Sequence, residues 1–237
     1  MSPVRQPSSV AGVDGCKAGW IALLLADDGT CEVFVTASFA EILALSAAAI
    51  IAIDMPIGLP DRIVPGGRGP EAAARAVLGP RRSSVFSVPS RSTVWERDYR
   101  RACSEAARTS EPPRMVSQQA FHLFPKIREI DGLMSAELED RIHEVHPELA
   151  FWRLNDGRPM NHPKKSPAGK EERHAVLLRH GLPTSALASV PRGAAMDDLL
   201  DAAASALIAR RIARGEAVPF PAEPGRDGRG LRMAIWA

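Results

Sequence analysis

The sequence predicts an α/β protein built on a mixed five-stranded sheet with helices on its faces. Short apolar segments separated by turn residues dominate the first sixty positions, and longer helical patterns dominate the rest. A capped helix also lies between the third and fourth apolar segments. A right-handed crossover through that helix places the fourth strand parallel to the first. The first quarter of the chain therefore has the order β-β-β-α-β.

Each of these early elements has its own signal. The first three strands form an antiparallel meander, with turn residues Asp27-Asp28-Gly29 after the second. Ser38 and Glu41 form a capping box at the start of the short helix. The fourth strand is an unbroken β-branched run, as expected of a strand buried on both faces. The predicted strands span residues 10–14, 19–26, 31–36 and 50–54.

The remaining chain is organised around one insertion. Pro and Gly residues open a loop near residue 60, and helical patterns follow at 71–78, 93–108 and 117–133, the last kinked or divided at Pro125. We expect a fifth strand at 141–146, helices at 148–154, 170–180 and 195–214, and an edge strand at 231–236. The sequence thus predicts a single domain over residues 1–237, with a mostly helical insertion at about 60–140 between strands four and five.

Composition narrows the class of protein. The chain is 45% hydrophobic and 24% charged, which is typical of a globular protein. Its longest apolar run, residues 44–53, falls short of the roughly 20 residues that a membrane span needs. The first nine residues lack the apolar centre of a secretory signal, so we expect a cytoplasmic protein without a membrane partner. Three cysteines without a Cys-x-x-Cys pair predict neither disulfides nor zinc. The net charge of +2 permits a nucleic-acid partner without requiring one.

Acidic residues recur where the predicted topology brings elements together. Asp14 and Asp54 end neighbouring parallel strands, about 5 Å apart in the sheet. Asp198 and Asp201 share one face of the long C-terminal helix, and Glu144 on the fifth strand would support them. Because clustered carboxylates repel one another and prefer hard cations, we expect Mg²⁺ or Mn²⁺ here, with two ions bound. Asp14, Asp54, Asp198 and Asp201 are the predicted ligands, and all five acids are candidate catalytic residues.

Each of the four aspartates also has a simpler interpretation. Asp14 and Asp54 could be turn residues at strand ends. Asp198 could interact with the helix dipole, and Asp201 could lie on a solvated face. Their combination on one topology is what favours a metal site.

Two basic loops are candidates for phosphate contacts. Arg81 and Arg82 precede the hydroxyl of Ser83, and Lys164 and Lys165 form a similar loop before a helix. Cations combined with hydroxyl donors suit a phosphate group. Together with the acids, they indicate metal-assisted hydrolysis of phosphodiesters.

Seven motifs are spread over nearly the whole chain: Gly12-Val13-Asp14-Gly15-Cys16, Ile53-Asp54-Met55-Pro56, Arg81-Arg82-Ser83-Ser84, Glu144-Val145-His146-Pro147-Glu148, Lys164-Lys165-Ser166, Asp197-Asp198-Leu199-Leu200-Asp201-Ala202 and Gly230-Leu231-Arg232-Met233. Together they resemble the family called domain of unknown function 429. Because that family is described as predicted nucleases, the resemblance implies an RNase H-like fold and nuclease activity. Asp198 to Ala202 is similar to the last-helix signature of Holliday-junction resolvases, whose strand acids match Asp14 and Asp54. Resolvases have a glutamate at the position of Asp54. The ribonuclease H pattern adds a glutamate within the first helix, where this chain has the capping residue Glu41.

The sequence therefore predicts a divalent-metal-dependent nuclease with a nucleic-acid partner. One alternative is a non-catalytic nucleic-acid-binding module, in which the acids are structural. Another is an ATP-using phosphotransferase of related fold, which would need a duplicated core that 237 residues hardly allow.

Overall fold

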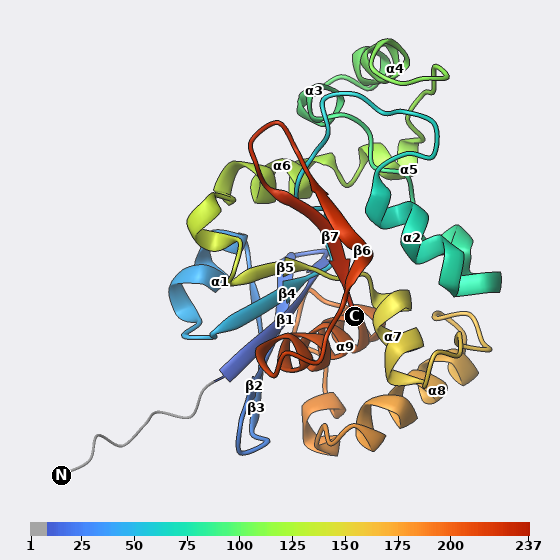
Figure 1. Ribbon diagram of the computed structural model, residues 1–237. Helices are drawn as coiled ribbons and strands as arrows, with labels where there is room; N and C mark the ends of the chain where they lie inside the picture. The colour runs from blue at the N-terminus through green and yellow to red at the C-terminus, as the bar shows by residue number, and fades with distance from the viewer. Residues whose placement is uncertain (1–8) are drawn as a thin grey trace. The chain divides into compact units, whose positions relative to one another are not determined.

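The computed structural model describes residues 9–237, which form two compact units (Figure 1). The core unit contains residues 9–54, Arg141–Val218 and Trp236–Ala237. The insertion unit contains Met55–Asp140 and Pro219–Ile235. The chain therefore leaves the core unit directly after Asp54 and returns to it at Arg141.

A mixed five-stranded sheet of order β3-β2-β1-β4-β5 is the centre of the core unit. The pairs β1–β2 and β2–β3 are antiparallel, whereas β1–β4 and β4–β5 are parallel. This arrangement confirms the α/β class and the mixed five-stranded sheet predicted from the sequence. The strands are β1 (Ser9–Cys16), β2 (Gly19–Ala26), β3 (Cys31–Thr36), β4 (Ile50–Ile53) and β5 (Ile142–Glu144).

The crossover helix α1 (Phe39–Leu45) joins β3 to β4. Ser38 Oγ accepts a hydrogen bond from the backbone N–H of Glu41 and donates one to Glu41 Oε1. Phe39 packs edge-on against Trp20 of β2, and both rings are fully buried. The predicted cap is confirmed, and Glu41 serves helix α1 through its hydrogen bond to Ser38.

Helix α9 (Met196–Ala213) packs against β1, β2 and β4. Figure 1 shows it beside the strands of the core sheet. Its central residues are buried on all sides, since α7 (Pro147–Leu154) and α8 (Pro167–Arg179) also contact it. Short side chains, chiefly Ala, let this helix lie very close to the sheet.

The insertion unit is mostly helical, as its sequence predicts. It also contains a two-stranded sheet of β6 (Pro219–Arg226) and β7 (Arg232–Trp236). The predicted strand near the C-terminus therefore exists, but it pairs with β6 rather than forming an edge of the five-stranded sheet. The helices are α2 (Gly69–Leu78), η1 (Gly79–Ser84), α3 (Arg91–Trp95), α4 (Tyr99–Arg108), α5 (Gln118–Phe121), α6 (Phe124–Leu133) and η2 (Ala136–Leu138).

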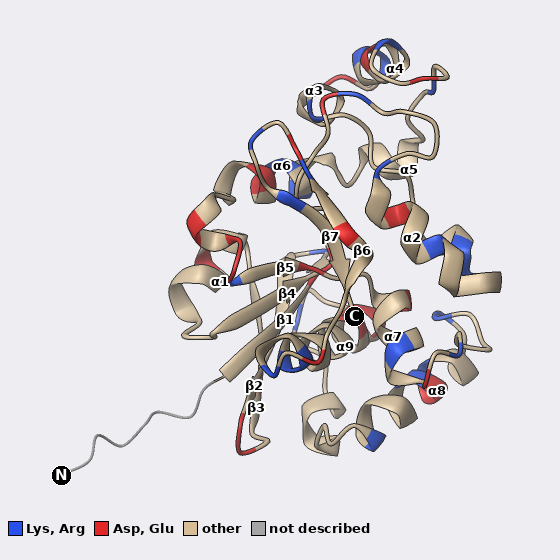
Figure 2. Ribbon diagram, in the orientation of Figure 1, with Lys and Arg blue, Asp and Glu red and all other residues tan. Residues whose placement is uncertain are grey.

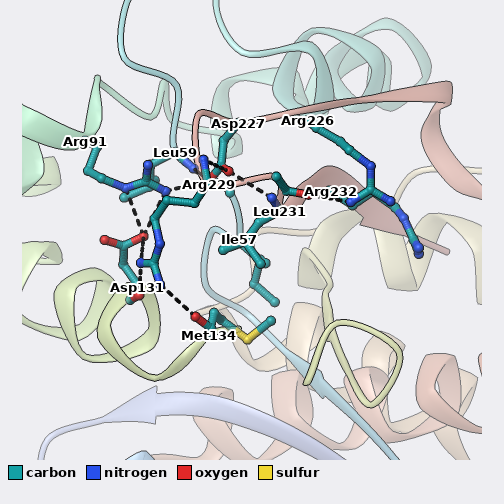
Figure 3. A network of polar contacts seen from close by, with 12 residues as sticks. Ile57, Leu59, Arg91, Asp131, Met134, Arg226, Asp227, Arg229, Leu231 and Arg232 are labelled. Atoms are coloured by element: carbon teal, nitrogen blue, oxygen red, sulfur yellow. Dashed lines mark hydrogen bonds and ion pairs between the residues drawn. The ribbon is translucent and has the colours of Figure 1, made fainter. Parts of the chain in front are cut away.

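A buried polar network connects the segments of the insertion unit (Figure 3). The carboxylate of Asp227 accepts hydrogen bonds from the backbone N–H groups of Leu59 and Leu231, at 3.0 and 2.9 Å. Arg91 donates to Asp227 at 2.5 Å and to Asp131 at 3.2 Å. Because a carboxylate with several donors is costly to leave unpaired, this network fixes the β6–β7 turn onto the chain that follows β4.

Candidate active site

Asp14 and Asp54 lie side by side at the carboxyl ends of β1 and β4. These strands pair in parallel with Val13 opposite Ile53, and the backbone N–H of Asp54 donates to Val13 O at 3.0 Å. Asp14 is 8% exposed, and its Oδ1 accepts the N–H of Gly15 at 2.7 Å. Sheet register alone therefore makes these two carboxylates neighbours.

Gly12 allows helix α9 to bring a third acid to this edge. A Cβ built on Gly12 would lie 2.0 Å from Ala202 O and 2.0 Å from Ala206 N, both backbone atoms of α9. Only a residue without a side chain fits at this contact. One position before Ala202 is Asp201, which is 2% exposed. The negative charge of Asp201 raises the pKa of both Asp14 and Asp54, so the three carboxyl groups lie near one another, and we call them the acidic cluster.

Lys164 is the cation of this cluster. Its Nζ donates to Asp201 Oδ2 at 2.8 Å, and its side chain is 41% exposed. The loop that carries it is fixed at the start of α8, where Ser166 Oγ accepts the N–H of Gly169 at 3.0 Å. A Cβ on Gly169 would come within 1.9 Å of Pro163 O, so this glycine also allows the loop to pack closely. Lys165, the other predicted basic residue of the loop, is exposed.

The three acids strongly influence one another. Burial raises the pKa of Asp14 well above its ordinary value, and the charges of Asp54 and Asp201 raise it further. Burial, then Asp201, raises the pKa of Asp54 to about 7. Burial raises the pKa of Asp201 to about 6, although Lys164 opposes this shift. Burial lowers the pKa of Lys164, but Asp201 and the other two acids raise it to a net value above normal. The cluster thus holds more potential negative charge than one ammonium group balances.

Asp198 has a different environment from the other three aspartates. Its Oδ2 accepts the backbone N–H of Ala195 at 2.9 Å, so it caps the start of α9. It is half-buried, and burial raises its pKa. Its negative charge also raises the pKa of Asp14, with the smallest effect among the four neighbouring charged groups. The capping of α9 therefore accounts for the hydrogen bond of Asp198. Its small effect on Asp14 places it at the margin of the cluster.

Glu144 does not join the cluster. Glu144 of β5 pairs with Ile53 of β4, which is the residue before Asp54. Because successive side chains of a strand alternate between faces, Glu144 and Ile53 share the face opposite Asp14 and Asp54. Gly12 is two residues before Asp14, and the face of β1 that carries Asp14 is therefore the face that lies against α9. The structure therefore places Glu144 on the other side of the sheet from α9.

A buried acid that the sequence analysis left without a role lies near Asp201. Glu148, in the first turn of α7, accepts a 2.5 Å hydrogen bond from Arg173, and its charge raises the pKa of Asp201. Its other oxygen, Oε2, is buried and has no hydrogen-bond partner among residues 9–237. The sequence signal that could have identified Glu148 is an acid in the first turn of a helix that begins shortly after β5. Strand β5 ends at the same edge of the sheet as β1 and β4.

The other predicted phosphate contacts belong to the insertion unit. Arg81, Arg82 and Ser83 lie on the short helix η1, which follows α2. Figure 2 shows Lys and Arg positions both on this segment and on the loop before α8. The two basic loops predicted from the sequence are thus divided between the units, and Lys164 and Lys165 share the core unit with the acids.

The donor chemistry of the cluster fits a hard divalent cation. Asp14, Asp54 and Asp201 supply only carboxylate oxygens, which Mg²⁺ and Mn²⁺ prefer, and Glu148 adds a buried oxygen that accepts no hydrogen bond from the described part of the chain. In the part of the chain that the structure describes, however, no three acidic, histidine or cysteine side chains are arranged as a group that could hold a metal ion. In this structure the ammonium of Lys164 supplies the positive charge next to Asp201.

The fold and this cluster define an α/β protein with acidic residues at the carboxyl ends of the parallel strands. A family model described as protein of unknown function (DUF429) matches residues 12–226, so the chain belongs to that family. No curated protein and no solved structure matches it. No helix within residues 9–237 has the length and apolar character needed to cross a membrane.

Proposed function

We propose that the core unit is a divalent-metal-dependent phosphodiesterase acting on nucleic acid, with Asp14, Asp54 and Asp201 as the metal ligands. The observation that carries the proposal is the approach of these three carboxyl groups, two of them buried, which are supplied by β1, the end of β4, and α9. Their mutual repulsion is a cost to the fold that a divalent cation relieves. Glu148 is a candidate for a further ligand or a support for Asp201.

Each residue then has a defined task. A bound Mg²⁺ or Mn²⁺ would activate water and neutralise charge on the phosphate. Lys164 keeps Asp201 ionised in the absence of metal and, being partly exposed, can transfer its hydrogen bond to a phosphate oxygen of the substrate. Lys165 is exposed beside it and suits a backbone phosphate. Arg81, Arg82 and Ser83 are proposed contacts to more distant phosphates.

Cleavage assays test this proposal directly. Purified protein is incubated with Mg²⁺ or Mn²⁺ and branched DNA, single-stranded DNA or RNA, and Asp14→Asn and Asp201→Asn are compared with wild type. We expect cleavage by wild type and a loss of at least about a hundredfold in both variants. Asp156→Asn is the matched control, since Asp156 is exposed, has a positive φ that Asn tolerates, and lies in the same unit.

A metal titration separates the site from the substrate. Binding of Mn²⁺, measured by calorimetry, should be lost in Asp14→Asn and retained in Asp156→Asn, and its stoichiometry distinguishes one ion from the predicted two. If wild type binds no Mn²⁺, the metal site is wrong. If it binds Mn²⁺ but cleaves none of the nucleic acids, the metal site stands and nucleic acid is the wrong substrate class. Lys164→Met should retain Mn²⁺ binding in the titration and should cleave more slowly in the cleavage assay.

A further inference from the structure

The insertion unit contains a cavity of about 330 Å³ that the proposed nuclease function does not use. It is bounded by α4, the start of α5 and two segments with no regular structure, residues 86–90 and 113–117. This volume is at the lower end of the range for ligand pockets, about 300–1,000 Å³. Much of the wall is apolar, formed by Ile63, Phe86, Val88, Ala106, Val116 and Ala120.

The two irregular segments leave backbone donors at the cavity. The amide groups of Ser87, Val88, Met115 and Val116 donate no hydrogen bond to any residue within 9–237. Val88 and Val116 are nevertheless buried, at 3% and 8% exposure. Backbone amides without a protein acceptor are available to a ligand, so these segments are suited to one that supplies acceptor atoms.

The polar side chains at the cavity can also donate hydrogen bonds to a ligand. Arg114 is exposed, and its guanidinium forms no ion pair with another described residue, while its backbone N–H donates to Ser110 Oγ at 2.8 Å. Ser87 Oγ accepts from Arg75, and Ser117 Oγ accepts from the N–H of Ala120. Each of these two hydroxyl groups therefore keeps its own hydrogen for an acceptor. The cavity offers one cation and several donors, and no carboxylate lines it.

Met115 provides an independent reason to expect a ligand. It lines the cavity and is 77% exposed, the highest value among the large hydrophobic residues that the structure describes as exposed. An apolar ligand seated against Met115 would remove this surface from water, and a flexible thioether adapts readily to such a partner.

We propose that this cavity binds a small organic monoanion with an apolar body and one carboxylate. The apolar body lies against Val88, Val116 and Met115, and the carboxylate is held by Arg114 with help from the unpaired amides. A guanidinium group matches the two oxygens of a carboxylate, which fixes the orientation of the ligand. This site is independent of the acidic cluster in the core unit.

Binding of 2-naphthoate, compared with its neutral analogue 2-naphthamide, tests the proposal by calorimetry. We expect wild type to prefer 2-naphthoate, and Arg114→Gln to weaken it about tenfold while leaving 2-naphthamide unchanged. Arg101→Gln is the matched control, because Arg101 is an exposed arginine of the same unit that does not line the cavity. Ala120→Leu, which fills the cavity, should abolish binding of both compounds, provided that its circular dichroism matches wild type.

Equal affinity for the two compounds, or an unchanged affinity in Arg114→Gln, would overturn the assignment of Arg114. Absence of saturable binding by either compound to wild type would overturn the site itself. The Asp14→Asn variant should bind 2-naphthoate as wild type does, so this result is separate from that of the nuclease assay.

Discussion

Three aspartates of the core unit are held where an ionised carboxylate is poorly solvated. Asp14 and Asp201 are almost fully buried, and Lys164 alone of the described cations donates directly to one of the three. Burying charge costs free energy unless each charge is paired, so an unmatched group tends to take up a proton instead. Carboxylates placed in this way reduce stability in return for a function.

The pH dependence of stability should reveal this cost. The pKa values of Asp54 and Asp201, about 7 and about 6, exceed the value of about 4 expected in the unfolded chain. Between about pH 4 and about pH 7 the folded protein therefore binds more protons than the unfolded chain, and these groups make the free energy of unfolding fall as pH rises. Urea unfolding across this range should show a smaller fall in Asp54→Asn than in wild type.

Asp156→Asn serves as the control here as well, since Asp156 is exposed and should leave the slope unchanged. Added Mn²⁺ should raise the stability of wild type above about pH 7, where Asp54 and Asp201 are ionised, and have little effect near pH 4. An identical slope in wild type and Asp54→Asn would show that Asp54 titrates normally.

Single residues of the site differ in how far the sequence could predict them. Asp14 and Asp54 follow from strand order alone, because parallel neighbours end at the same edge. The face of Glu144 depends on a one-residue register that periodicity could not fix, since one step moves a side chain across the sheet. Glu148 was missed because its relevance rests on burial beside Arg173, a contact between residues far apart in sequence.

At the scale of elements, the contact between β1 and α9 determines whether the cluster exists. Gly12 lies directly against backbone atoms of α9, so no side chain at this contact can adjust to a change in the distance between strand and helix. Small residues at Ala202 and Ala206 complete this close approach. A strand and a helix held at this distance place Asp14 and Asp201 within one buried volume.

Gly12→Ala should therefore separate the two elements. The added Cβ would overlap backbone atoms at 2.0 Å, and we expect a loss of stability of about 3 kcal/mol or more, together with loss of Mn²⁺ binding. Gly132→Ala is the control, because Gly132 lies in helix α6 with nothing within 4 Å of the new Cβ, and the change should stabilise by up to about 1 kcal/mol. Urea unfolding measures both, and equal stability of Gly12→Ala and wild type would refute the close contact.

The elements themselves were largely predictable, and the exceptions have local causes. The five strands of the core sheet, strand β7 and helices α7, α8 and α9 were expected close to their observed positions. The helix expected at 93–108 is divided into α3 and α4, because Glu96 ends the first in an extended conformation and Asp98 caps the second. The pattern at 117–133 is divided close to Pro125, which was one of the two predicted outcomes: α5 ends at Phe121, and Pro125 lies in the first turn of α6. The partner of β7 could not be read from the sequence, because an isolated strand pattern does not identify its neighbour.

At the scale of the whole molecule, the chain forms two compact units that each contain a cysteine suitable as a reporter. Cys16 is buried in the core unit, and Cys103 is partly buried in α4 of the insertion unit, where its Sγ donates to Val116 O. The insertion unit depends on Asp227, which accepts hydrogen bonds from backbone groups on both sides of it. The two thiols can therefore report on the two units separately.

Asp227→Ala should destabilise the insertion unit selectively. Removing the carboxylate leaves the backbone N–H groups of Leu59 and Leu231 without this acceptor and takes away one of the two acidic partners of Arg91, at a cost of about 3 kcal/mol or more. In mild urea, labelling of Cys103 followed by mass spectrometry should become faster while labelling of Cys16 stays unchanged. Glu223→Ala, an exposed acid of the same unit, is the control. A parallel increase at both thiols would mean that the units unfold together.

The long separation in sequence between Gly12 and helix α9 sets the order of events during synthesis. Strands β1 and β4 leave the ribosome early, carrying Asp14 and Asp54, whereas α9 emerges only after the whole first segment of the insertion unit. Until α9 docks on Gly12, both carboxylates remain in water, without Asp201 beside them. A nascent chain thus carries two separate surface acids, and it acquires the acidic cluster only when its last long helix folds onto the sheet.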